Sequence, residues 1–208
     1  LYREAARRDA RRATFADDEE AFLRSCQLRL NITPCGPADI ARVIELAQRT
    51  NQLNASGTRY GPDAGATLIN RSGQATFVLR CADLYGDYGL VGFAAVRFPA
   101  DVGVDGGVIR VEEFMLSCRV QGRRLERAFF HYLATATSGA PAKALWINFR
   151  ATGRNGPAAR VLADLGFRPC AHGGRTLDLP APDLASDLVA VVAPDDDRLD
   201  ASARRMMA

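Results

Sequence analysis

One stretch, residues 108–138, constrains the fold more than any other part of the chain. Its first half, Val108 to Leu116, has the apolar pattern of a strand, and this pattern breaks at residues 117–119. Gly122 follows, and a helix is then predicted from the apolar spacing of Leu125, Phe129, Tyr132 and Leu133. A strand that turns at a glycine into a helix aims backbone N–H groups, and the positive helix end, at whatever lies over the turn. The sequence therefore predicts an anion site there, suited to a pyrophosphate or a phosphopantetheine arm.

Composition excludes several classes of protein. The 208 residues, 48% hydrophobic, suit one domain of ordinary size, and a net charge of +3 does not favour a nucleic-acid partner. No apolar run is long enough to predict a membrane span. The five cysteines are odd in number and show no metal-ligand spacing, which indicates reduced thiols, no metal site and a cytoplasmic protein.

The rest of the chain alternates predicted strands and helices. Strands are expected at 27–33, 75–82, 88–98, 144–149, 176–179 and 188–192, and helices at 3–25, 39–50 and 158–165. Polar loops are expected at 55–73 and 150–157. We expect residues 1–26 to form a charged connector helix, or equally a solvated surface helix, followed by a domain over 27–193 and a disordered tail over 194–208. Because the chain opens at Leu1 on this charged segment, we expect it to be a piece of a longer polypeptide.

This order of elements resembles the GNAT acyltransferase fold, an α/β fold with a mixed, mostly antiparallel sheet flanked by helices. Its signature, Q/R-x-x-G-x-G/A, would lie at Arg119–Arg124 or begin at Gln121. The first register places Arg124 at a position meant for a small residue, and the second places Arg124 and Glu126 at the two such positions. Small residues there let the backbone approach a pyrophosphate, so we expect coenzyme A to bind less readily than a phosphopantetheine arm alone.

Longer strings give a more specific resemblance. They are Gln48–Asn54, Gly86–Gly92, Phe114–Val120, and Arg154-Asn155 with Leu165–Phe167. In this order they resemble the C-terminal, GNAT-like region of the FkbH-like glyceryl transferases of polyketide biosynthesis, over residues 1–180. The resemblance implies an acyltransferase that follows a haloacid-dehalogenase-type domain. It would take a glyceryl group from a small phosphorylated three-carbon donor and deliver it to the phosphopantetheine thiol of an acyl carrier protein, with no tightly bound cofactor.

Three residues are candidates for catalysis. Cys118 lies at a helix start beside Arg119, where a thiol gains nucleophilicity, although a free cysteine is also commonly a small buried hydrophobe. Glu113 falls in phase with Ile109, Val111 and Met115, and is either a general base or a paired structural carboxylate. His172, in a glycine-rich loop, is a second candidate base or a structural residue. The other cysteines and His131 are interpreted as structural.

Candidate binding residues surround the predicted turn. They are Arg119, Gly122, Arg123, Arg124, Asn51, Asn54, Arg154 and Asn155. Helix capping and loop hydrogen bonds are the alternative for the asparagines and Arg154. Two other functions stay open: a non-catalytic module that docks a carrier protein through arginines, and an acyl-CoA-dependent N-acetyltransferase with Glu113 as base.

Overall fold

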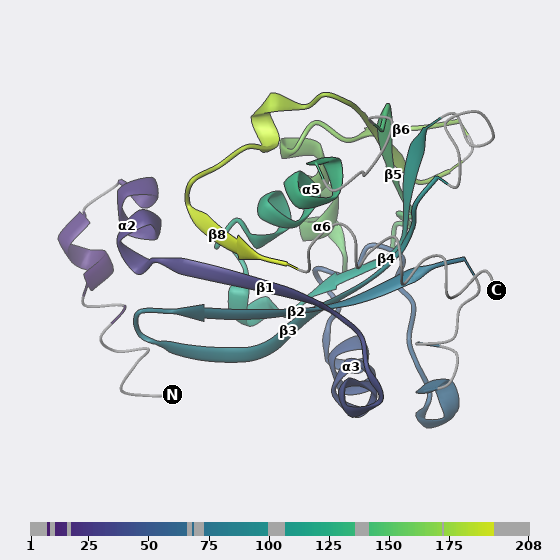
Figure 1. The fold of residues 1–208 in the computed structure, drawn as a ribbon, viewed down its shortest axis with the longest axis horizontal. Coiled ribbons are helices and arrows are strands. Elements are labelled where there is room, and N and C mark those ends of the chain that lie inside the picture. Colours follow the sequence, from purple (N-terminus) through teal and green to yellow (C-terminus); the bar gives the residue numbers. More distant parts are fainter. Residues whose placement is uncertain are drawn as a thin grey trace.

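An eight-stranded sheet is the central element of the computed structural model (Figure 1). The structure describes residues 8, 11–15, 18–65, 68, 73–99, 107–135, 142–171 and 173–193. The strand order is β6-β7-β5-β4-β3-β2-β1-β8. Pairs β1–β8 and β4–β5 are parallel and the other five pairs are antiparallel. The prediction of a mixed, mostly antiparallel sheet is confirmed.

The strands and helices follow the predicted order. The strands are β1 (Leu28–Pro34), β2 (Ala75–Asp83), β3 (Gly86–Arg97), β4 (Val108–Leu116), β5 (Ala144–Ile147), β6 (Arg168–Pro169), β7 (Arg175–Asp178) and β8 (Val189–Val192). The helices are α2 (Glu19–Cys26), α3 (Ile40–Arg49), α5 (Leu125–Thr135) and α6 (Gly156–Asp164). Only the two-residue β6 was not predicted, because so short a pairing leaves no periodicity in the sequence.

Helices cover both faces of the sheet, and each face has its own core. Helices α5 and α6 lie on one face, and α3 lies on the other (Figure 1). The larger core contains Phe129 and Leu162 from the first two helices, together with Phe114 of β4. The smaller core contains Val43 and Leu46 of α3. This arrangement places the β4–α5 turn at the edge of the larger core.

A β-bulge in β4 corrects the predicted phase of Glu113. Ala95 pairs with Glu113, but the next residue of β3, Val96, pairs with Val111. The extra residue, Glu112, reverses the alternation that follows it. Ile109 and Val111 therefore belong to the larger core, whereas Met115 belongs to the smaller one. Glu113 shares a face with Met115, so the predicted common face with Ile109 and Val111 was wrong.

The predicted connector helix is interrupted within residues 1–26. A 3₁₀ turn occupies Ala13–Phe15, and α2 starts only after Asp18, whose side chain accepts a 2.9 Å hydrogen bond from the Ala21 N–H. Phe22, Leu23 and Cys26 of α2 are buried in the larger core. The end of the predicted connector is therefore packed as part of the domain. The predicted tail at 194–208 lies outside the described residues.

Candidate functional site

The turn between β4 and α5 has the backbone geometry of a glycine-rich loop. Ser117 caps a short 3₁₀ turn, Cys118–Val120, by accepting a hydrogen bond from the Arg119 N–H. Gly122 has φ +76° and Arg124 has φ +61°. Both values fall in the left-handed region, which glycine adopts freely and a residue with a Cβ adopts at a cost. The signature register that starts at Arg119 therefore matches the backbone, with arginine where glycine would be unstrained.

The side chain of Arg124 turns towards the N-terminal part of the chain. Its Nη2 lies 3.6 Å from Oε2 of Glu19, the first residue of α2. Both side chains keep more than a third of their surface exposed, 39% and 49%, so this ion pair adds little to stability. The guanidinium group remains accessible to an anion at the turn.

Cys118 is the exposed thiol of the protein. Cys26, Cys35 and Cys81 are buried, and Cys170 is half-buried with its Sγ 2.7 Å from the Gly173 carbonyl oxygen. Burial raises the pKa of Cys26, raises that of Cys35 to about 11 and raises that of Cys81 to about 12. These three thiols stay protonated near neutral pH and are poor nucleophiles. Cys118 is accessible, but it lies in the short 3₁₀ turn and α5 starts only at Leu125, so the predicted helix start beside the thiol is this turn and the nucleophile stays a prediction.

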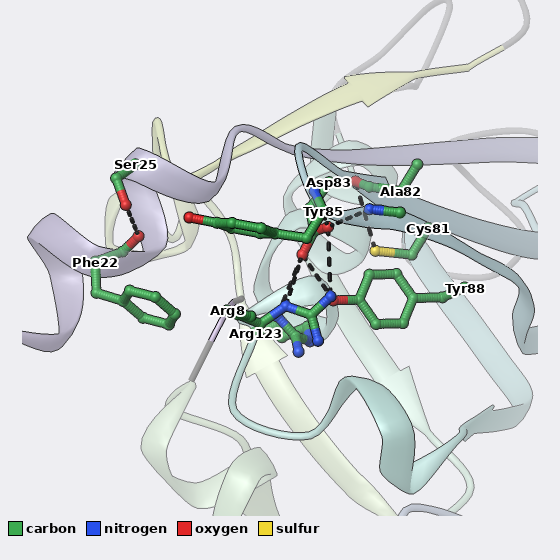
Figure 2. A network of polar contacts seen from close by, with 10 residues as sticks. Arg8, Phe22, Ser25, Cys81, Ala82, Asp83, Tyr85, Tyr88 and Arg123 are labelled. Carbon is green, nitrogen blue, oxygen red and sulfur yellow. Dashed lines mark hydrogen bonds and ion pairs between the residues drawn. The ribbon is translucent and has the colours of Figure 1, made fainter. Parts of the chain in front are cut away.

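The other two arginines of the turn behave differently from each other. Arg119 is exposed, and its Nε donates to Ser117 Oγ at 3.3 Å. Arg123 points to the carboxylate of Asp83 at the end of β2, with 3.7 Å between Nη1 and Oδ2 (Figure 2). Its side chain is only 13% exposed, so Arg123 is held by contacts within the protein. Arg119, by contrast, is open to a ligand.

Glu113 lies on the opposite face of the sheet from α5. Its carboxylate accepts hydrogen bonds from the hydroxyl groups of Ser56 and Thr58, the latter at 3.1 Å, and only 6% of the residue is exposed. Both carboxylate oxygens therefore have a hydroxyl donor. These hydrogen bonds satisfy the buried group. The arrangement suits either a structural carboxylate or a general base that accepts a proton from a hydroxyl group.

A segment that the sequence did not reveal covers the free edge of β4. The parallel pairing with β5 ends at Val111 and Ile147, but β4 continues to Leu116. Beyond that point Leu53–Ala55 takes the place of a neighbouring strand: the Ala55 N–H donates to Phe114 O at 3.0 Å and the Leu116 N–H donates to Leu53 O at 2.9 Å. Two main-chain groups of this edge, the Phe114 carbonyl and the Leu116 N–H, are thus already paired.

Two asparagines predicted to bind a ligand hold this segment in place. Asn155 is 1% exposed, and its Nδ2 donates to Asn54 O at 3.0 Å and to Arg150 O at 2.8 Å. Asn54 is also 1% exposed, and its Nδ2 donates to Thr58 O at 2.9 Å. Their side chains serve loop hydrogen bonding, the alternative that the sequence left open.

The remaining predicted residues are spread around the site. Asn51 accepts a hydrogen bond from Arg59, which also donates to two carbonyl groups at the end of α3. Arg154 is exposed, and no described residue hydrogen-bonds to its side chain. His172 lies outside the described residues. Among the described residues, no three His, Cys, Asp or Glu side chains lie close enough to share a metal ion.

Glu126, which the sequence did not single out, lines a small apolar cavity. The cavity, of about 10 Å³, has room for roughly one water molecule. Its other lining residues are Leu53, Ala55, Phe114, Leu116, Ala158, Val161 and Leu162. Glu126 is 8% exposed, no other described side chain hydrogen-bonds to it, and burial raises the pKa of its carboxyl group.

Comparison with known proteins gives the fold. No family model matches the chain, and no curated protein matches it in sequence. An acetyltransferase from Thermus thermophilus superposes with a TM-score of 0.54 at 18% identity, covering 74% of this chain and 99% of that one. A GNAT-family acetyltransferase from Staphylococcus aureus gives 0.51 at 11% identity, covering 72% and 99%. The chain has the GNAT fold.

The GNAT neighbours differ widely from this chain in sequence, so they establish its architecture and not its substrate. A domain from Methanocaldococcus jannaschii is equally similar in shape, with a TM-score of 0.53 at 10% identity over 73% of this chain and 99% of that one. Within the described ranges, no helix combines the length and apolar character that crossing a bilayer requires.

Proposed function

We propose that this domain transfers an acyl group as a thioester, carrying a glyceryl unit from a phosphorylated three-carbon donor to the phosphopantetheine thiol of an acyl carrier protein. The observation that carries the proposal is the exposed thiol of Cys118 at the β4–α5 turn of a GNAT fold. The four sequence strings that resemble the FkbH-like glyceryl transferases support the choice of glyceryl and of a carrier protein. A haloacid-dehalogenase-type domain would precede this chain in the parent protein.

In this proposal the acyl group moves in two steps, and the haloacid-dehalogenase-type domain of the parent protein hydrolyses the second phosphate ester of a bisphosphoglycerate donor with water, releasing phosphate. The Cys118 thiolate attacks the acyl-phosphate carbonyl, so that an S–C bond forms and the C–O bond to phosphate breaks, releasing phosphate. The pantetheine thiolate then attacks the thioester, and the Cys118 thiolate leaves and regains a proton. Arg119 and Arg124 are the turn residues with guanidinium groups accessible to the phosphate of the donor or of the arm.

Mass spectrometry tests the proposal directly. The parent protein is incubated with bisphosphoglycerate and digested, and we expect a glyceryl adduct on the peptide that contains Cys118. Cys118→Ala should abolish both the adduct and the transfer to carrier protein. Cys170→Ala, which removes the half-buried thiol, is the matched control and should retain both. Transfer that persists in Cys118→Ala would remove Cys118 as the nucleophile.

A second candidate function is a non-catalytic module that docks the carrier protein. It is favoured by the pairing of Glu113 with Ser56 and Thr58, because a carboxylate satisfied in this way can be purely structural. Docking through Arg119 and Arg124 against an acidic partner would be salt-dependent. Under this alternative, Glu113→Gln and Cys118→Ala would leave both carrier binding and overall chemistry unchanged. Under acyl transfer, Cys118→Ala would abolish chemistry with binding retained.

A further inference from the structure

A buried carboxylate, Asp83, joins three distant parts of the chain (Figure 2). It closes β2, and its side chain is fully buried. Its Oδ1 accepts hydrogen bonds from the N–H groups of Tyr85 at 2.8 Å and Gly86 at 3.0 Å, which shape the β2–β3 turn. Its Oδ2 accepts a 2.6 Å hydrogen bond from the Tyr88 hydroxyl group. These three hydrogen bonds fix the position of the carboxylate independently of its charged partners.

Two arginines, 115 positions apart in the sequence, share this carboxylate. Nε of Arg8 lies 3.1 Å from Oδ2, and Nη1 of Arg123 lies 3.7 Å from the same oxygen. Both guanidinium groups also lie over the ring of Tyr88, at 4.9 Å and 4.8 Å from its centre. Figure 2 shows them converging on Asp83 beside that ring. Arg8 thus meets a residue of the β4–α5 turn inside one buried cluster.

Arg123 depends on this cluster for its position. Its Nε is buried and makes no hydrogen bond, and Asp83 is its anionic partner among the described residues. Its backbone N–H donates to Val120 O at 3.2 Å, while Gln121 N–H donates to Cys118 O at 3.2 Å. The backbone from Cys118 to Arg123 therefore consists of consecutive hydrogen-bonded turns. The side chain of its last residue, Arg123, is paired with Asp83.

Arg8 keeps water from the carboxylate. Its guanidinium group lies over Tyr85, 5.6 Å from the ring centre, as well as over Tyr88, and only 13% of its side chain is exposed. Without it, water would reach Asp83, and an ion pair at 3.7 Å in water holds a side chain weakly. We infer that Arg8 is a positioning residue for the Cys118 turn, acting through the carboxylate that it shares with Arg123.

Hydrogen exchange in the whole chain tests this inference without any assay of activity. We expect Arg8→Met to speed amide exchange across residues 118–124 by roughly fivefold, while α3 is unchanged. Arg24→Met is the matched control, because Arg24 pairs with Asp187 on the surface, where the side chains are 53% and 73% exposed. It should leave exchange at the turn unchanged. Equal exchange at the turn in the two variants would overturn the inference.

A double-mutant cycle separates positioning from general destabilisation. Arg123→Met alone should speed exchange at the turn, and adding Arg8→Met should have no further effect there, because the link is already cut. Arg8→Lys keeps the charge but loses the planar guanidinium, and should give an intermediate rate. If the effects of the two substitutions were simply additive, Arg8 would act on the turn by some other route and the inference would fail. None of these outcomes depends on whether the domain transfers acyl groups.

Discussion

Two glutamates buried on opposite faces of the sheet differ in how their carboxyl groups are satisfied. Glu113 receives two hydroxyl hydrogen bonds, whereas Glu126 faces an apolar cavity with no side-chain donor among the described residues. A buried carboxyl group without such a donor favours the protonated form. Perturbed carboxyl groups that line cavities are frequent at functional sites. The protonation of Glu126 should therefore be linked to folding.

Glu126 should make stability depend on pH. Burial raises its folded-state pKa above the ordinary 4.5, so its contribution is fully present below pH 4.5 and is lost as pH rises through the folded pKa. Glu126→Gln has no proton to lose. We expect the variant to match the wild type below pH 4.5 and to become progressively more stable than it above that pH, measured by urea unfolding.

A surface glutamate provides a control of opposite sign. A hydrogen bond from Arg42 lowers the pKa of Glu45, so its contribution is present above pH 4.5 and is lost as pH falls through the folded pKa. Glu45→Gln should lose a little stability relative to the wild type as pH rises, and the effect should be small because the pair is exposed to solvent. A pH-independent difference for Glu126→Gln would show that its carboxyl group is ionised and solvated in the folded protein.

At the scale of elements, the β4–α5 turn combines a backbone suited to glycine with the bulky side chain of Arg124. Glycine would relieve the contact between a Cβ and the adjacent carbonyl group that the left-handed conformation imposes. The next residue begins α5, and the Ala128 N–H donates to Arg124 O at 3.2 Å, so Arg124 caps the helix. The arginine thus occupies a position where its backbone is strained.

Glycine at position 124 should therefore stabilise the domain. We expect Arg124→Gly to be more stable than Arg124→Ala by about 1 kcal/mol, because both lose the exposed pair with Glu19 but only glycine removes the Cβ. For a domain of this size the difference is roughly 2–4 °C in melting temperature. Equal melting temperatures for the two variants would mean that the left-handed backbone is not present in solution.

The sequence predicted those elements that leave a local pattern. Alternation indicated β1 and β4, helical spacing indicated α3 and α5, and Gly122 marked the turn. The bulge at Glu112 and the pairing of Leu53–Ala55 with β4 left no such pattern, because each depends on hydrogen bonds to a distant strand. For the same reason the role of Arg123 was not foreseen, because its partner Asp83 is set by tertiary structure. For Asn155 the sequence offered loop hydrogen bonding as an alternative, but not its partner Asn54.

On the scale of the whole molecule, three features on one side of β4 restrict the space for a ligand. Leu53–Ala55 covers the edge of the strand, Glu126 lies at the start of α5, and Arg124 occupies a glycine position in the turn between them. A nucleotide-bearing cofactor would have to pass all three. In the proposed function, the phosphopantetheine arm of a carrier protein would meet the same edge of β4 but would bring a single phosphate, and no nucleotide, to the turn.

Acetyl-CoA should therefore not bind detectably to this chain. Its pyrophosphate would meet the Cβ of Arg124, at the position where a glycine would let the backbone approach a phosphate. Titration calorimetry at low salt should give no heat with acetyl-CoA and measurable heat with phosphopantetheinylated carrier protein. Arg124→Gly should weaken binding of the modified carrier by roughly tenfold, the loss of one charge-assisted contact to phosphate, and leave the unmodified carrier unaffected. Acetyl-CoA binding by the wild-type chain would contradict this prediction and favour an ordinary acetyltransferase. Acetyl-CoA binding gained only in Arg124→Gly would instead identify the arginine as the residue that excludes the nucleotide.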